Sequence, residues 1–137
     1  MLVREVMKEN AEVINCERNI REAAEMMAKG NFGGIPVERN DKMIGMITDR
    51  DIVIRVVAAG KDPETTRVLD SMSEGISYCF DDEDVEEVAR KMSSVQVRRL
   101  PVVNRNKKLV GIVSLVDIAR KAKNEKLTHE TMSQTAH

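Results

Sequence analysis

The sequence of 137 residues contains no tryptophan, and its aromatic side chains are two Phe and one Tyr. So few rings cannot form the stacked platform on which many proteins hold single-stranded nucleic acid. No apolar run approaches the ~20 residues that a membrane-spanning helix needs. Residues 1–13 also lack the apolar core and small-residue cleavage site of a signal peptide. We therefore expect a cytoplasmic protein with no membrane partner.

Neither positive nor negative charge predominates in the sequence. Lysine and arginine total 22, aspartate and glutamate total 23, and the formal net charge is -1. This balance provides no general attraction to nucleic acid, and no basic recognition helix is evident. We do not expect a nucleic-acid partner. The one remaining way to bind RNA or DNA would be through a groove between protomers.

The usual signatures of catalysis and metal binding are missing. Both histidines, His129 and His137, lie in a polar tail, and no G-x-S-x-G, H-E-x-x-H, Walker A or G-x-G-x-x-G motif occurs. The two cysteines, Cys16 and Cys79, form no metal-ligand pattern and have no local histidine. We expect neither an enzyme nor a metal protein, and we interpret the cysteines as free thiols. A disulfide would require their Cα atoms to lie within about 7 Å.

A tandem repeat dominates what the sequence does contain. Displacing the chain by 65 residues superposes similar segments in order, and one extra residue in a later turn changes the displacement to 66. The matched segments are 3–7 with 68–72, 20–27 with 85–92, 35–37 with 100–102, 43–48 with 109–114 and 51–52 with 117–118. We therefore place copy one at 1–62, copy two at 63–122 and a polar tail at 123–137.

Both copies predict the same order of elements. A helical lead-in ends at Met7 or Met72, and a brief extended segment follows. Helices then begin at Ile20 and Val85, where apolar residues recur at helical spacing. Asn19 and Asp84 stand where N-caps are expected, and Gly30 is expected to stop the first helix.

Two strands and a final helix complete each copy. The extended segments are 12–15, 34–38 and 43–48 in copy one and 76–80, 100–103 and 109–114 in copy two, and the last helices cover 51–59 and 117 to about 126. The fold class is therefore α+β, with tandem β-α-β-β-α repeats. We expect the two copies to pack sheet against sheet about a pseudo-twofold axis as one obligate unit.

The candidate chemistry lies where each last helix begins. Thr48 and Ser114 place a hydroxyl there, and Asp51 and Asp117 follow three residues later. An N-cap would explain part of this pattern. Free N–H groups at a helix start also attract phosphate, and a nearby carboxylate can accept hydrogen bonds from ribose hydroxyls. The pattern therefore suits a nucleoside phosphate.

Basic residues distinguish the two copies. Arg98-Arg99 precedes a strand of copy two, where two guanidiniums could reach a phosphate beside Ser114, although solvated surface charge is the plainer interpretation. Copy one has Gly33-Gly34 at these positions, and Arg50 is its local basic candidate. Gly45 and Gly111 stand within the strands that precede Thr48 and Ser114. Each could mark a bulge, a tight strand start or a place where a ligand approaches the backbone closely.

These residues resemble the CBS-domain pair, also called the Bateman module, over roughly residues 1–122. The signature occurs twice, as Gly34-Ile35-Pro36-Val37 with Gly45–Ile52 and as Arg99–Val103 with Gly111–Ile118. The whole chain is similar to small stand-alone pairs with no attached enzyme or channel. The copy-two residues further resemble a nucleotide-binding repeat of the AMP-activated protein kinase gamma subunit.

The resemblance implies an adenosyl ligand in a cleft between the copies: AMP, ADP, ATP or an S-adenosylmethionine relative, with no required cofactor. Asp51 and Asp117 would hold ribose, and the neighbouring hydroxyls would contact ribose or phosphate. Copy two is the preferred site. Its implied ligand-binding residues are Ile76, Ser77, Arg98, Arg99, Pro101, Ser114 and Asp117. Those of the weaker copy-one site are Ala11, Glu12, Ile35, Pro36, Thr48, Arg50 and Asp51.

Two functions follow from the resemblance. The preferred hypothesis is a regulatory homodimer that senses an adenine nucleotide and signals to an unidentified protein partner. The alternative is a protein–protein interaction scaffold that binds no ligand.

Overall fold

The computed structural model describes residues 1–9 and 11–123, and in it the chain forms two compact units. Unit 1 contains Met1–Ala11, Ser77–Arg105 and the described residues from Val110 onward, whereas unit 2 contains Glu12–Ile76 and Asn106–Leu109. Each unit has its own apolar core. The first residues of the chain therefore fold with copy two, and the lead-in of copy two folds with copy one.

Unit 2 contains a three-stranded sheet in the order β1 (Ile14–Asn15), β2 (Gly34–Arg39), β3 (Lys42–Thr48). Strand β1 runs parallel to β2, and β2 pairs antiparallel with β3. The turn of this hairpin has positive φ at both Asn40 and Asp41, which suits the strand twist and favours these residue types. The strands confirm the predicted segments of copy one, although β1 is shorter than expected.

Helix α1 (Ile20–Gly30) confirms the predicted start, because the Asn19 side chain accepts a hydrogen bond from the Glu22 amide at 2.9 Å. The helical spacing buries Ile20 and its apolar neighbours one turn apart against the sheet. The predicted stop is confirmed, because α1 ends at Gly30. Gly30 is still helical, and Asn31 adopts the left-handed conformation with φ 55°. A Cβ on Gly30 would lie 1.9 Å from the Phe32 ring, so Gly30 makes room for that side chain.

The second helix of unit 2 begins as α2 (Asp49–Ile52) and continues as a π-helical turn over Val53–Val57. The sequence predicted one regular helix here, and the π-helical turn is a departure from it. Gly60, which follows the predicted end of this helix at Ala59, has φ 70°, and nothing lies within 4 Å of the position that a Cβ would take there. The linker that follows belongs to unit 2, where the Pro63 carbonyl accepts a hydrogen bond from the Arg21 amide at 3.0 Å.

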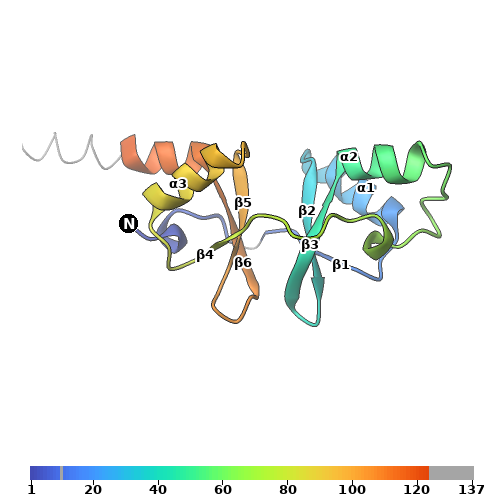
Figure 1. The fold of residues 1–137 in the computed structure, drawn as a ribbon, viewed down its shortest axis with the longest axis horizontal. Coiled ribbons are helices and arrows are strands. Elements are labelled where there is room, and N and C mark those ends of the chain that lie inside the picture. The colour runs from blue at the N-terminus through green and yellow to red at the C-terminus, as the bar shows by residue number, and fades with distance from the viewer. Residues whose placement is uncertain (10, 124–137) are drawn as a thin grey trace, which may run out of the picture. The chain divides into compact units, whose positions relative to one another are not determined.

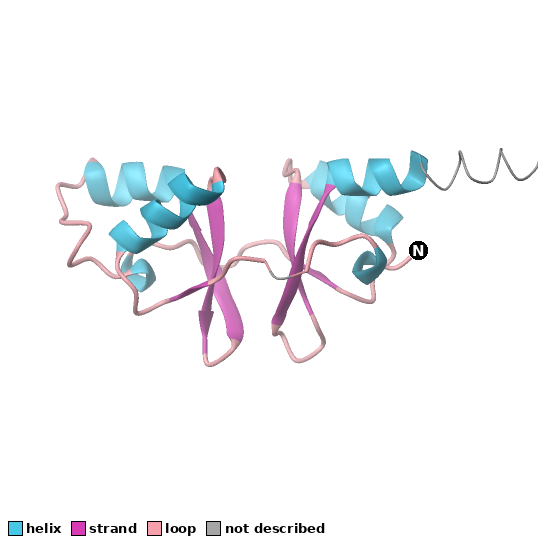
Figure 2. Cartoon of the chain, turned by 180° about the vertical axis from the view of Figure 1, so that it is seen from behind, coloured by secondary structure: helices cyan, strands magenta, loops and turns pink. Residues whose placement is uncertain are grey.

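Unit 1 repeats this arrangement with β4 (Cys79–Phe80), β5 (Arg99–Val103) and β6 (Leu109–Ser114) in the order β4-β5-β6. Helix α3 (Val85–Ser94) begins at the predicted N-cap Asp84, and residues 115–123 are helical. The predicted end of that last helix and the polar tail lie outside the described residues. In each unit the helices lie on one side of the sheet, as the ribbon (Figure 1) and the view from behind (Figure 2) show. No helix within 1–9 and 11–123 has the length and apolarity to cross a membrane.

The exchanged lead-ins are 3₁₀ turns, Val3–Glu5 in unit 1 and Val68–Asp70 in unit 2. Val3 and Val68 are both fully buried in the core of the unit they join. Figure 1 shows the first turn, in dark blue, beside α3. The lead-ins are therefore structural parts of the opposite copy's fold.

Each lead-in ends by pairing with a hairpin strand. Lys8 exchanges two backbone hydrogen bonds with Ile112, at 2.8 and 3.0 Å, and Ser73 does the same with Met46. This pairing explains the glycines next in the strands. A Cβ on Gly111 would lie 2.7 Å from the Lys8 carbonyl oxygen, and a Cβ on Gly45 would lie 2.5 Å from that of Ser73. The close approach at both glycines is thus made by the chain's own backbone, and a β-bulge interrupts the pairing of β2 and β3 beside Gly45.

Candidate functional site

The start of α2 in unit 2 carries a reciprocal capping box. The Thr48 hydroxyl accepts a hydrogen bond from the Asp51 amide at 3.1 Å, and Asp51 Oδ2 accepts one from the Thr48 amide at 3.0 Å. Asp51 Oδ1 accepts a further bond from the Ser73 hydroxyl at 3.1 Å. Arg55 Nη1 lies 3.9 Å from the same oxygen. Both oxygens of this carboxylate, which is only 10% exposed, are therefore engaged within the protein.

The carboxylate at the equivalent position of unit 1, that of Asp117, has fewer partners than that of Asp51. The Ser114 hydroxyl accepts a hydrogen bond from the Asp117 amide at 3.1 Å, which confirms the predicted N-cap. Among the described residues, the one partner of the Asp117 carboxylate is Lys8, whose Nζ lies 4.0 Å from Oδ1. The Lys8 side chain is 74% exposed and that of Asp117 14%. The Asp117 carboxylate therefore keeps acceptor capacity that Asp51 has used.

The basic pair of copy two adjoins this helix start. The Leu115 amide donates a hydrogen bond to the Arg98 carbonyl at 3.0 Å, so the segment leading into β5 meets the end of β6. Arg98 and Arg99 are both exposed. The prediction that these strand ends lie close is confirmed at the backbone, so the Arg98 backbone lies beside a helix start that attracts anions.

Unit 2 has the same backbone contact, but the side chain beside it is acidic instead of basic. The Asp49 amide donates to the Gly33 carbonyl at 2.9 Å. The Asp49 carboxylate covers Gly33, with Oδ2 2.9 Å from the point that a Cβ would occupy. Where unit 1 presents Arg98, unit 2 therefore presents an acid, which disfavours phosphate at that position.

The remaining candidate residues differ in exposure. In unit 1, Ser77 is half-buried and Pro101 is buried; Ile76, assigned to unit 2, is half-buried. Ala11 is half-buried, Glu12 and Arg50 are exposed, and Pro36 is buried. The Ile35 side chain is 0% exposed in the core of unit 2, so any ligand contact there would involve its backbone.

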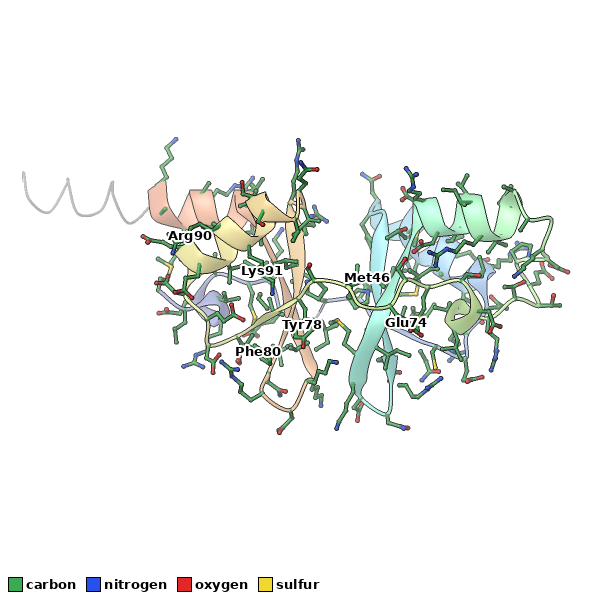
Figure 3. All side chains as sticks on the ribbon, viewed as in Figure 1. Met46, Glu74, Tyr78, Phe80, Arg90 and Lys91 are labelled. Carbon is green, nitrogen blue, oxygen red and sulfur yellow. The ribbon has the colours of Figure 1, made fainter. Side chains whose placement is uncertain are left out.

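Sequence reasoning missed an aromatic cluster in unit 1. Lys91 Nζ lies 5.8 Å from the centre of the Tyr78 ring and donates a hydrogen bond to the Tyr78 carbonyl, and the two side chains lie side by side in Figure 3. Phe80 meets Tyr78 edge-on at 5.7 Å. Copy one has Val13 in place of Tyr78. The one available signal was the chain's single tyrosine next to Ser77.

Arg105 extends this cluster over the other side of Phe80. Its guanidinium carbon lies 4.0 Å from the centre of the Phe80 ring, a cation–π geometry. The same guanidinium bonds both Asp82 oxygens, at 2.8 and 2.9 Å, and thereby lowers the pKa of that carboxyl group. The cluster fixes the turn that follows β4.

Both cysteines lie in the apolar cores. Cys16 and Cys79 are free and buried, each in the core of its own unit. Burial raises the pKa of Cys79 to about 12. Within the part of the chain that the structure describes, no group of three or more His, Cys, Asp or Glu side chains could hold a metal ion.

Comparisons with known proteins agree on one family. A CBS-domain model matches residues 3–58 and again 67–124. The CBS domain-containing protein YhcV of Bacillus subtilis is 33% identical over 135 residues, which are 98% of this chain and 95% of that protein. Hypoxic response protein 1 of Mycobacterium tuberculosis is 36% identical over 118 residues, which are 85% of this chain and 82% of that protein.

Two crystal structures share the fold. Hypoxic response protein I with two coordinated zinc ions has a TM-score of 0.78 at 35% identity, covering 88% of this chain and 98% of that one. The CBS domain pair of protein MJ0100, in complex with 5-methylthioadenosine and S-adenosyl-L-methionine, has a TM-score of 0.74 at 28% identity and covers 91% and 98%.

Proposed function

This chain belongs to the CBS-domain family, and from that premise we propose that it is a regulatory module that binds an adenosyl ligand and passes its occupancy to a protein partner. The observation that carries the proposal is the available carboxylate of Asp117 beside a capped helix start and the Arg98-Arg99 pair. The MJ0100 pair, a relative in fold, contains two adenosyl ligands in its crystal structure. AMP, ADP, ATP and S-adenosylmethionine are therefore the candidate ligands.

Each residue of the unit 1 site has a role in this proposal. Asp117 accepts hydrogen bonds from the ribose hydroxyls, and Ser114 with the helix start accommodates phosphate. Arg98 and Arg99 supply the charge that a phosphate needs. Ile76, Ser77 and the neighbouring ring of Tyr78 flank the adenine, for which an aromatic side chain is a suitable surface.

The copy-one residues form the weaker site. Asp51 is already bonded through both oxygens, and Asp49 stands where unit 1 has Arg98. A phosphate there would meet a like charge, with Arg50 as the nearby exposed base. We propose that this site binds a given nucleotide more weakly than the unit 1 site does.

Isothermal titration calorimetry with AMP, ADP, ATP and S-adenosylmethionine tests the proposal. We expect at least one ligand to bind with about one strong site per chain. Asp117→Asn, which keeps size and removes the charge, should abolish that binding, while the matched variant Asp51→Asn should retain it. Silence for all four ligands, with no rise in melting temperature, would favour a scaffold without a ligand.

We further propose that the chain is a homodimer. The π-helical turn of unit 2 exposes Val53, Ile54 and Val57, at 57%, 49% and 67%. Val116, in the first turn of the last helix of unit 1, is 56% exposed. Apolar side chains grouped on one helical turn are typical of association surfaces.

A further inference from the structure

We propose that the side chain at the end of each exchanged lead-in, Lys8 in unit 1 and Ser73 in unit 2, decides whether the aspartate beside it can accept a ligand. This inference rests on the proposed function, because it assumes that the aspartates bind ribose. Lys8 and Ser73 occupy the same position of the repeat, 65 residues apart. Both form the two-bond backbone bridge to a hairpin strand, so their side chains start from equivalent places.

Ser73 closes the unit 2 position. Its hydroxyl donates to Asp51 Oδ1 at 3.1 Å in a half-buried setting. Asp51 Oδ2 is held by the Thr48 amide, so with the Ser73 bond neither oxygen is without a partner and each keeps at most one further acceptor site. A ribose hydroxyl would have to compete with the Ser73 hydroxyl, which the lead-in backbone holds beside Oδ1, and a Ser73 hydroxyl that was displaced would lose its acceptor.

Lys8 leaves the unit 1 position accessible. Its ammonium is 4.0 Å from Asp117 Oδ1, beyond hydrogen-bond distance, and its side chain is largely exposed. Such an exposed ion pair contributes little and is readily displaced. Lys8 adds positive charge to that of Arg98 and Arg99, so once a ribose occupies Asp117 the freed ammonium can pair with a ligand phosphate. The unit 1 site is thereby assigned to anionic adenine nucleotides rather than to uncharged adenosine.

Calorimetry with AMP and with adenosine on three chains tests the Ser73 half of the proposal. We expect about one AMP site per chain in the wild type. In Ser73→Ala, whose backbone bridge stays intact, we expect a second site for adenosine, because Asp49 opposes a phosphate but not an uncharged nucleoside. Ser71→Ala is the matched control, because the Ser71 hydroxyl is buried and has no hydrogen-bond partner among the described residues, so it is not bonded to Asp51. An adenosine stoichiometry that does not rise in Ser73→Ala, or rises equally in Ser71→Ala, would overturn this half.

Lys8→Ala, which removes the ammonium without introducing a hydroxyl that could bond Asp117, tests the other half with the same two ligands. We expect AMP affinity to fall about two- to fivefold, the range of an exposed ion pair, and adenosine affinity not to fall. Lys61→Ala, which removes an exposed lysine elsewhere, should change neither. Equal weakening of both ligands would indicate a merely structural role and contradict the proposal.

The outcomes separate this inference from the function on which it rests. If the wild type and every variant bind neither ligand, the proposed function fails and this inference fails with it. If AMP binds in an Asp117-dependent manner but Ser73→Ala and Lys8→Ala behave like their controls, only the inference fails.

Discussion

At the scale of single residues, the two copies share a backbone and differ in chemistry. The amide-to-carbonyl contact at the helix start is kept in both, from Leu115 to Arg98 and from Asp49 to Gly33. What changes is the side chain placed on that frame, an arginine in unit 1 and an acid over a glycine in unit 2. A repeat that conserves its fold in this way can assign different ligand preferences to its two copies.

Cys79 gives a prediction at this scale. Its thiol is buried and its pKa is raised to about 12, mainly because burial disfavours the thiolate. Folding therefore keeps the thiol protonated, and this contribution to stability is lost as the pH rises from the ordinary value of 9.0 toward 12. At pH 8 we expect a disulfide reagent such as Ellman's to label neither cysteine of the native protein and both after denaturation. Rapid labelling of Cys79 in the native protein would contradict its burial.

At the scale of elements, the exchanged lead-ins hold each unit together. Gly111→Ala would place a Cβ 2.7 Å from the Lys8 carbonyl oxygen, which is backbone and cannot turn away. We expect this variant to lower the free energy of unfolding by about 1–3 kcal/mol, measured by urea denaturation. Gly60→Asn is the control: φ is 70°, nothing lies within 4 Å, and asparagine tolerates this conformation, so we expect a much smaller change. Equal stability of Gly111→Ala and the wild type would mean that the lead-in is not held at this bridge.

Much of the element order could be predicted from the repeat. Apolar spacing and the caps Asn19 and Asp84 located the main helices, because these signals are local. The exchange of lead-ins could not be predicted, since two similar copies offer equally suitable surfaces and the sequence does not say which one each lead-in joins. The π-helical turn at Val53–Val57 also left no local signal.

Part of the candidate site could likewise be predicted from the sequence, and part could not. The Ser114–Asp117 and Thr48–Asp51 pairs follow from local spacing, and the structure confirms both caps. Ser73 was missed as a partner of Asp51 because their contact depends on the exchanged lead-in, 22 residues along the chain. The difference between the two aspartates is therefore a tertiary property.

At the scale of the whole molecule, the exposed apolar turn predicts self-association. Val57 is 67% exposed, so Val57→Lys should leave the fold of unit 2 intact while placing a charge in the proposed interface. We expect the wild type to sediment as a dimer and Val57→Lys to shift toward the monomer. Val13→Lys, at a residue 39% exposed on another segment of unit 2, is the control and should remain dimeric. A wild type that sediments as a monomer at all concentrations would refute the proposed dimer.

A crystal structure of the chain grown with AMP tests the central claim most directly. The account predicts ribose hydroxyls within hydrogen-bond distance of the Asp117 carboxylate, with the phosphate between Ser114 and the Arg98-Arg99 pair. AMP bound at Asp51 with Asp117 unoccupied, or no AMP at either aspartate at saturating concentration, would contradict it.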